Sequence, residues 1–170
     1  ITYKKALPYL NSTTDYDLVL GGINDRIRLG LFGVLSYNFK AGYFISHKNL
    51  PFTDYRHFLG NQTLMITSDY LASYRLLPYY TYSSSEWFAE AHAEHHFNGF
   101  IINKIPLLKK LKIQEVAGAH FLFNEKLSQY YELNFGIEKL FRFIRLEYVL
   151  GYMPDGTIRN GFLFGLKLEF

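Results

Sequence analysis

The chain has 170 residues, of which 49% are hydrophobic and 19% aromatic, with no cysteine and a formal net charge of +3. The absence of cysteine excludes thiolate metal sites, thiol nucleophiles and disulfides. The small and dispersed charge excludes nucleic acid as an expected partner. No apolar run reaches the roughly eighteen residues that a transmembrane helix needs. The aromatic content instead suits many strands, some of them carrying aromatic residues at a membrane interface.

Alternating apolar and polar residues predict about eight strands. In chain order they cover residues 1–6, 15–30, 34–47, 84–102, 113–124, 130–138, 142–152 and 159–170. In the second segment the alternation changes parity near residues 21–25, which we interpret as a β-bulge rather than a turn. The last segment is the most regular, because one parity is wholly apolar: Phe162, Phe164, Leu166, Leu168 and Phe170. Since successive side chains of a strand point to opposite faces, this parity predicts a face in contact with lipid.

Short and long connections alternate between these segments. Residues 31–33 and 139–141 are tight, whereas residues 48–83 form the longest connection. Outer-membrane barrels show this asymmetry, with short periplasmic turns and long extracellular loops. We therefore expect an all-β fold: an antiparallel transmembrane β-barrel segment spanning residues 1–170, the C-terminal half of a larger barrel in the bacterial outer membrane. The chain carries no signal peptide, so we interpret it as a mature form or a fragment.

A polar stripe marks the fourth predicted strand. On a helix, His92 and His96 would lie one turn apart, which is a known zinc spacing, but on a strand their α-carbons lie roughly 13 Å apart. Strict alternation favours the strand, and we expect no catalytic residue, metal or cofactor. The stripe then faces the barrel lumen: Glu86, Glu90, His92, Glu94, His96 and Asn98. A metal-dependent envelope enzyme using this stripe, or a soluble ligand-binding β-barrel, are the alternatives.

The long connection and one basic turn complete the candidates. Residues 48–83 are rich in tyrosine and could fold from the extracellular side into the lumen. There Arg56 would pair with a carboxylate of the stripe; the alternative is an exposed loop arginine. Residues 103–112 carry four lysines. They form either a solvated turn or a basic periplasmic elbow resting on the inner leaflet.

Several motifs resemble an envelope family of Bacteroidota-type bacteria. They are His96-Phe97-Asn98-Gly99-Phe100, residues 103–111, residues 58–63, residues 76–80 and the terminal Gly-x-x-Leu-x-Phe at residues 165–170. Members of that family join an N-terminal carboxypeptidase-regulatory-like domain to a C-terminal barrel of unassigned function. The resemblance spans nearly the whole chain and implies a much longer parent protein.

The segment also distantly resembles barrels of the BamA/TamA outer-membrane assembly superfamily. Those barrels have one long loop ahead of the fifth strand from the end, and its Arg-Gly-aromatic tip docks inside the barrel. The resemblance makes Arg56 the candidate counterpart, although His57 stands where the glycine would be. It also implies an assembly signal at Gly165, Leu168 and Phe170. The expected role is structural, transport or assembly-type without catalysis. The expected partners are outer-membrane lipid, the assembly machinery and other envelope proteins.

Overall fold

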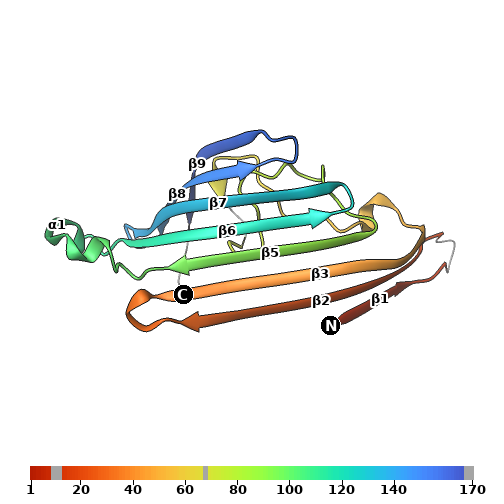
Figure 1. The fold of residues 1–170 in the computed structure, drawn as a ribbon, viewed down its shortest axis with the longest axis horizontal. Coiled ribbons are helices and arrows are strands. Elements are labelled where there is room, and N and C mark those ends of the chain that lie inside the picture. The colour runs from red at the N-terminus through yellow and green to blue at the C-terminus, as the bar shows by residue number, and fades with distance from the viewer. Residues whose placement is uncertain (9–12, 67–68, 167–170) are drawn as a thin grey trace.

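The computed structural model describes residues 1–8, 13–66 and 69–166. They form one nine-stranded sheet in the order β1-β2-β3-β5-β6-β7-β8-β9-β4 (Figure 1). All neighbours are antiparallel except β4 and β9. The strands are β1 (Thr2–Ala6), β2 (Asp15–Arg28), β3 (Val34–Asn49), β4 (Met65–Ile66), β5 (Trp87–His96), β6 (Gln114–Asn124), β7 (Leu127–Leu140), β8 (Ile144–Tyr152) and β9 (Ile158–Leu166).

Helical structure in the described ranges is confined to single turns. They are η1 (Gly30–Phe32), η2 (Phe52–Asp54), η3 (Ile102–Lys104) and α1 (Pro106–Lys109). Across the same ranges, no helix has the length and apolar character required to cross a membrane.

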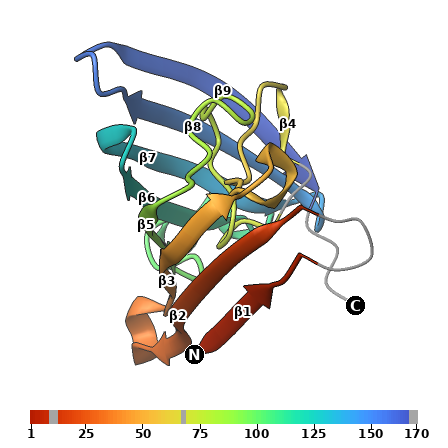
Figure 2. The same cartoon turned by 90° about the vertical axis from the view of Figure 1, so that its right-hand side faces the viewer.

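The predicted all-β, mostly antiparallel class is confirmed, and eight of the nine strands correspond to the eight predicted segments. The ninth, β4, is a two-residue strand inside the long connection and was not expected. The sheet is strongly curved but open, because in the described part of the chain β9 pairs with β4 rather than with β1 (Figure 2). These residues therefore form a curved wall and not a closed barrel.

The bulge predicted at residues 21–25 is wrong. The ladder between β2 and β3 runs without a shift from Leu18 opposite Phe44 to Arg28 opposite Val34, and the irregularities lie earlier, between Asp15 and Leu18. The alternation changes parity because the apolar residues of β2 change face. Leu18 is buried and Leu20 packs against the hydrophobic core. Ile23 instead lies opposite Phe39 on the other, exposed face of the same regular strand.

Strand β5 is shorter than the predicted segment 84–102. It begins at Trp87 and ends at His96, after which Asn98 and Gly99 adopt positive φ angles of 54° and 78° and turn the chain. The remaining residues belong to the two connections on either side. We call residues 50–86 the inner loop and residues 97–113 the basic elbow.

The inner loop covers one face of the sheet, which we call the inner face (Figure 2). Its residues Phe58, Tyr74 and Leu77 are buried with sheet residues in one hydrophobic cluster. The sheet contributes Phe88, Leu122, Tyr130 and Met153, the last just beyond β8. The loop is thus fixed by apolar packing along the middle strands, where each buried large side chain contributes about 1.5–3 kcal/mol.

The opposite, outer face is apolar and exposed. Phe162 is 77% exposed, Ile23 is 67% exposed and Phe135 is 56% exposed. Other exposed large apolar residues of this face include Phe39, Tyr43, Ile45, Phe121, Phe123, Tyr131, Leu146, Phe164 and Leu166. Rings of neighbouring strands touch across it, as Trp87 does with Phe123 at 4.8 Å and Tyr148 with Phe162 at 4.9 Å between centroids.

Candidate functional site

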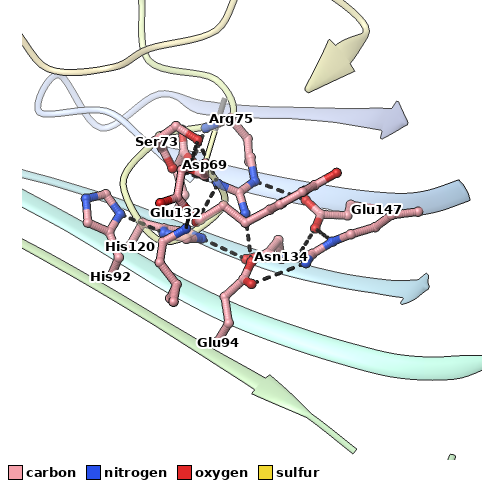
Figure 3. Close-up of polar contacts among 12 residues, drawn as sticks. Asp69, Ser73, Arg75, His92, Glu94, His120, Glu132, Asn134 and Glu147 are labelled. Atoms are coloured by element: carbon pink, nitrogen blue, oxygen red, sulfur yellow. Dashed lines mark hydrogen bonds and ion pairs between the residues drawn. The ribbon is translucent and has the colours of Figure 1, made fainter. Parts of the chain in front are cut away.

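Arg75 lies at the centre of the contacts between the inner loop and the sheet (Figure 3). Its side chain is fully buried. Nε donates to Glu147 Oε2 at 3.1 Å, and Nη2 donates to Glu94 Oε1 at 2.8 Å. Nη1 donates to the carbonyl oxygens of Ser73 at 2.6 Å and Tyr70 at 3.1 Å. One guanidinium therefore joins β5 and β8 to the turn that carries it.

Glu132 of β7 holds the same turn through its backbone. Its carboxylate accepts the backbone N–H of Arg75 at 2.6 Å and that of Leu76 at 2.7 Å. The hydroxyl of Tyr130 donates to the same carboxylate. Both oxygens of Glu132 are thereby engaged, so this buried charge is stabilised by directed donors.

Arg145 of β8 is the second buried guanidinium. Nη2 and Nη1 contact Glu94 Oε1 and Oε2 at 2.5 and 3.2 Å, and the same side chain donates to Glu147. The ring of Tyr70 lies 4.0 Å from its guanidinium carbon. Together these residues form what we call the inner-face cluster: Arg75, Glu94, Glu132, Arg145 and Glu147. Burying an ion costs several kcal/mol, so the cluster is stable only while each charge keeps its partners.

Two histidines share a hydrogen bond beside the cluster. Nδ1 of His92 lies 2.9 Å from Nδ1 of His120, and Nε2 of His120 lies 3.1 Å from Asn134 Oδ1. Only one of the two facing Nδ1 atoms donates, so the pair is held with one proton between the rings. The ring of Tyr74 lies 4.7 Å from that of His92 and covers the pair.

Burial also acts on Tyr74 of the inner loop. It raises the pKa of the Tyr74 hydroxyl well above its ordinary value. The hydroxyl therefore stays protonated and donates to the carbonyl oxygen of Phe121 at 2.7 Å.

The predicted stripe is placed only in part on the inner face. Glu90, His92, Glu94 and His96 are buried there. Glu86 and Asn98 are not part of it, because β5 begins after Glu86 and ends before Asn98, and both side chains are exposed. Phe88, which the polar pattern passed over, is buried on the same face.

The two histidines of the proposed zinc spacing have separate partners. His96 Nδ1 lies 2.8 Å from Glu138 Oε1, whereas His92 faces His120. Among residues 1–8, 13–66 and 69–166, no three histidine, aspartate or glutamate side chains are arranged to hold a metal ion.

Arg56 lies at the edge of the site. Nη2 donates to Glu90 Oε1 at 2.5 Å, and the guanidinium carbon lies 5.2 Å from the Phe88 ring centroid. Its side chain is 32% exposed and borders a hollow of about 560 Å³ that Lys40 and Asp69 also line. The Glu94 carboxylate forms its ion pairs with Arg75 and Arg145 instead. The deeply anchored arginine of the loop is therefore Arg75, which was not among the candidates predicted from the sequence.

One signal in the sequence could have found Arg75. In the later strands, the alternate positions whose side chains face inward include many carboxylates, among them Glu132, Glu138 and Glu147. The inner loop offers only two cations, Arg56 and Arg75, to an acidic wall. Charge balance alone makes both arginines candidates for docking.

Of the predicted terminal signal, Gly165 lies in β9, while Leu168 and Phe170 lie outside the described residues. A Cβ on Gly165 would meet the Tyr70 hydroxyl at 1.9 Å, so any side chain at this position would have to displace the Tyr70 side chain. Nearby, the Phe164 N–H donates to the carbonyl oxygen of Leu64 at 2.9 Å, next to the parallel pairing of β4 with β9.

A comparison with protein families finds one match. The model of the C-terminal domain of a family of unknown function (DUF5686) matches residues 1–137, from β1 into β7. No curated protein and no solved structure matches the chain.

Proposed function

The chain belongs to the C-terminal domain of the DUF5686 family, and from that premise we propose that it forms part of the wall of an outer-membrane β-barrel with a non-catalytic, assembly-type role. The observation that carries the proposal is the difference in polarity between the two faces of the sheet. Its outer face is apolar and exposed, while its inner face buries charged side chains under a loop. This is the arrangement that a barrel in lipid requires.

The outer face supports the membrane environment. Soluble monomers rarely expose contiguous apolar patches larger than a few hundred Å². Here exposed aromatic and aliphatic side chains continue from Ile23 on β2 to Phe162 on β9. The strands β5, β6, β8 and β9 have 10, 11, 9 and 9 residues. A membrane-crossing strand needs about 9–11 residues.

The inner face argues against the two alternatives. The pocket of a soluble ligand-binding barrel is lined predominantly by apolar side chains, whereas this inner face contains Arg75, Arg145 and their carboxylates. A metal-dependent enzyme would use the His92 and His96 stripe, whose side chains are engaged with different partners. Neither alternative explains the exposed aromatic outer face.

The inner loop supports an assembly-type role over an open diffusion channel. It precedes the last five strands of the main wall, β5 to β9, and it anchors an arginine on their inner face. That is the arrangement implied by the resemblance to the BamA/TamA superfamily, with Arg75 in the position expected of Arg56. The parent protein would add further strands that close the barrel, and an N-terminal carboxypeptidase-regulatory-like domain.

The test uses the full-length protein. In cells it should fractionate with the outer membrane, and in gels its mobility should change on heating, as folded barrels do. Reconstituted in liposomes, it should accelerate the folding of a small urea-denatured outer-membrane barrel relative to empty liposomes. Fractionation with soluble proteins would overturn the membrane location. Correct insertion without any acceleration would overturn the assembly role alone.

A further inference from the structure

The basic elbow, residues 97–113, projects beyond the end of the sheet between β5 and β6, where α1 lies (Figure 1). It contains four lysines, Lys104, Lys109, Lys110 and Lys112, and no aspartate or glutamate. All four lysines are exposed. The elbow therefore presents a local positive charge that exceeds the net charge of the whole chain, which is +3.

Apolar side chains are exposed among these lysines. Ile101 is 56% exposed, Ile105 is 48% exposed and Leu111 is 53% exposed. The neighbouring hairpin end between β2 and β3 adds Leu31 at 85% and Phe32 at 59%. A merely solvated turn would have no reason to hold several large apolar side chains in water.

The surface is held in place by contacts between the two connections. Nε2 of His95 lies 2.7 Å from the carbonyl oxygen of Phe32, and the rings of Phe32 and Phe100 lie 5.2 Å apart. Nζ of Lys104 lies 4.3 Å from the Phe100 ring centroid. The Ile102 N–H of the elbow donates to the Glu115 carboxylate of β6. Because these contacts already order the backbone, binding through this surface costs little additional conformational entropy.

We propose that the basic elbow binds anionic phospholipid headgroups, with its lysines on the phosphates and its apolar side chains at the boundary between headgroups and acyl chains. Lysines next to exposed aliphatic residues are the combination that binds such a surface. The elbow also lies at the strand ends, where the apolar outer face stops, so a bilayer around that face would bring its headgroups to the lysines. The inference rests on the proposed membrane location.

These 170 residues contain no cysteine, so Leu111→Cys adds a single labelling site to them, and any cysteine elsewhere in the full-length protein is replaced by serine. A fluorescent probe on Leu111→Cys in that full-length protein would report the polarity around the elbow. The protein is reconstituted in bilayers with increasing phosphatidylglycerol in phosphatidylcholine. We expect a blue shift that grows with the anionic fraction and weakens at high salt, since the screening length falls from about 10 Å at 0.1 M to about 3 Å at 1 M.

Two lysine pairs provide the matched comparison. In K109Q/K110Q, the apparent association with anionic headgroups should fall about 25-fold, from roughly fivefold per lysine. In K4Q/K48Q, which removes two exposed lysines elsewhere, the response should stay unchanged. A second probe on Asp155→Cys, in the turn between β8 and β9, should not respond to the anionic fraction, because that turn lies at the end of the sheet opposite to α1 (Figure 1).

The possible outcomes separate this inference from the proposed function. If the protein inserts but the Leu111→Cys probe behaves alike in neutral and anionic bilayers, the elbow does not bind lipid headgroups. An anionic response that persists in K109Q/K110Q would also overturn the inference. Failure of the protein to enter any bilayer would overturn the membrane location itself.

Discussion

Replacing Arg75 by methionine should release the inner loop from the sheet. Methionine keeps much of the length but removes the donors to Glu94, Glu147 and two carbonyl oxygens. Glu94 and Glu147 would then both depend on Arg145, the remaining guanidinium of the buried cluster. Removing one partner from a buried ion pair costs about 3–5 kcal/mol, and we expect a loss of stability in that range.

The assay combines urea unfolding of the reconstituted full-length protein with proteinase K cleavage inside the inner loop. Arg75→Met should lower the unfolding midpoint and expose the loop to cleavage. Arg56→Met should have a smaller effect, about 1 kcal/mol, because that side chain is 32% exposed and screened by solvent.

A second substitution tests the electrostatic reasoning. Adding Glu147→Gln to Arg75→Met removes one of the two carboxylates left to share Arg145. The double variant should therefore be more stable than the sum of the single effects predicts, with a coupling of about 1–2 kcal/mol. Wild-type stability and protease resistance in Arg75→Met, or strictly additive effects in the double variant, would refute the role assigned to the cluster.

Three further predictions concern other contacts. Phe135→Arg, on the exposed outer face, should cost about 2–4 kcal/mol in a bilayer if this site lies near the midplane. Asp155→Arg, in a turn, should cost only about 1 kcal/mol, from the hydrogen bonds lost to Thr157. Equal effects of the two substitutions on unfolding would contradict the assignment of faces. Gly165→Val should lower stability by about 1–3 kcal/mol through overlap with the side chain of Tyr70. Adding Tyr70→Ala should restore part of the lost stability. If it restores none, the clash is not the cause. Burial raises the pKa of Tyr74 above its ordinary value of 10.0, so the folded protein binds this proton more tightly than the unfolded chain and loses stability as pH rises above 10. Tyr74→Phe should reduce that alkaline loss in unfolding experiments, and an unchanged pH profile would exclude the contribution of this hydroxyl.

The sequence predicts the strands well because most of them place apolar side chains on the outer face and polar or charged side chains on the inner face, in alternation. The parities of β9 and β8 are correct at Phe162, Phe164, Leu146 and Tyr148, since a strand between an apolar and a polar surface has a strong period of two. The prediction fails in β2 because its apolar residues change face along the strand. Leu18 and Leu20 lie on the inner face, whereas Ile23 lies opposite Phe39 on the outer face, and this change resembles a bulge in the sequence.

The inner-face cluster was harder to predict, because its partners are far apart in the sequence. Arg75 reaches Glu94 on β5, Glu147 on β8 and, through its backbone, Glu132 on β7. The surrounding loop has no periodicity from which a direction could be read. Arg56 was selected instead because it lies in the longest connection and matches the loop arginine that the family resemblance implies, and its guanidinium pairs with Glu90.

The pairing of β4 with β9 has a consequence for any strand that might join the sheet at that edge. The Phe164 N–H is already bonded to the carbonyl oxygen of Leu64, and Met65 and Ile66 lie opposite Phe164 and Gly165. A backbone edge accepts one neighbour at a time. An incoming strand and the inner loop are therefore competitors for the same hydrogen bonds, and occupation of this stretch by one requires departure of the other.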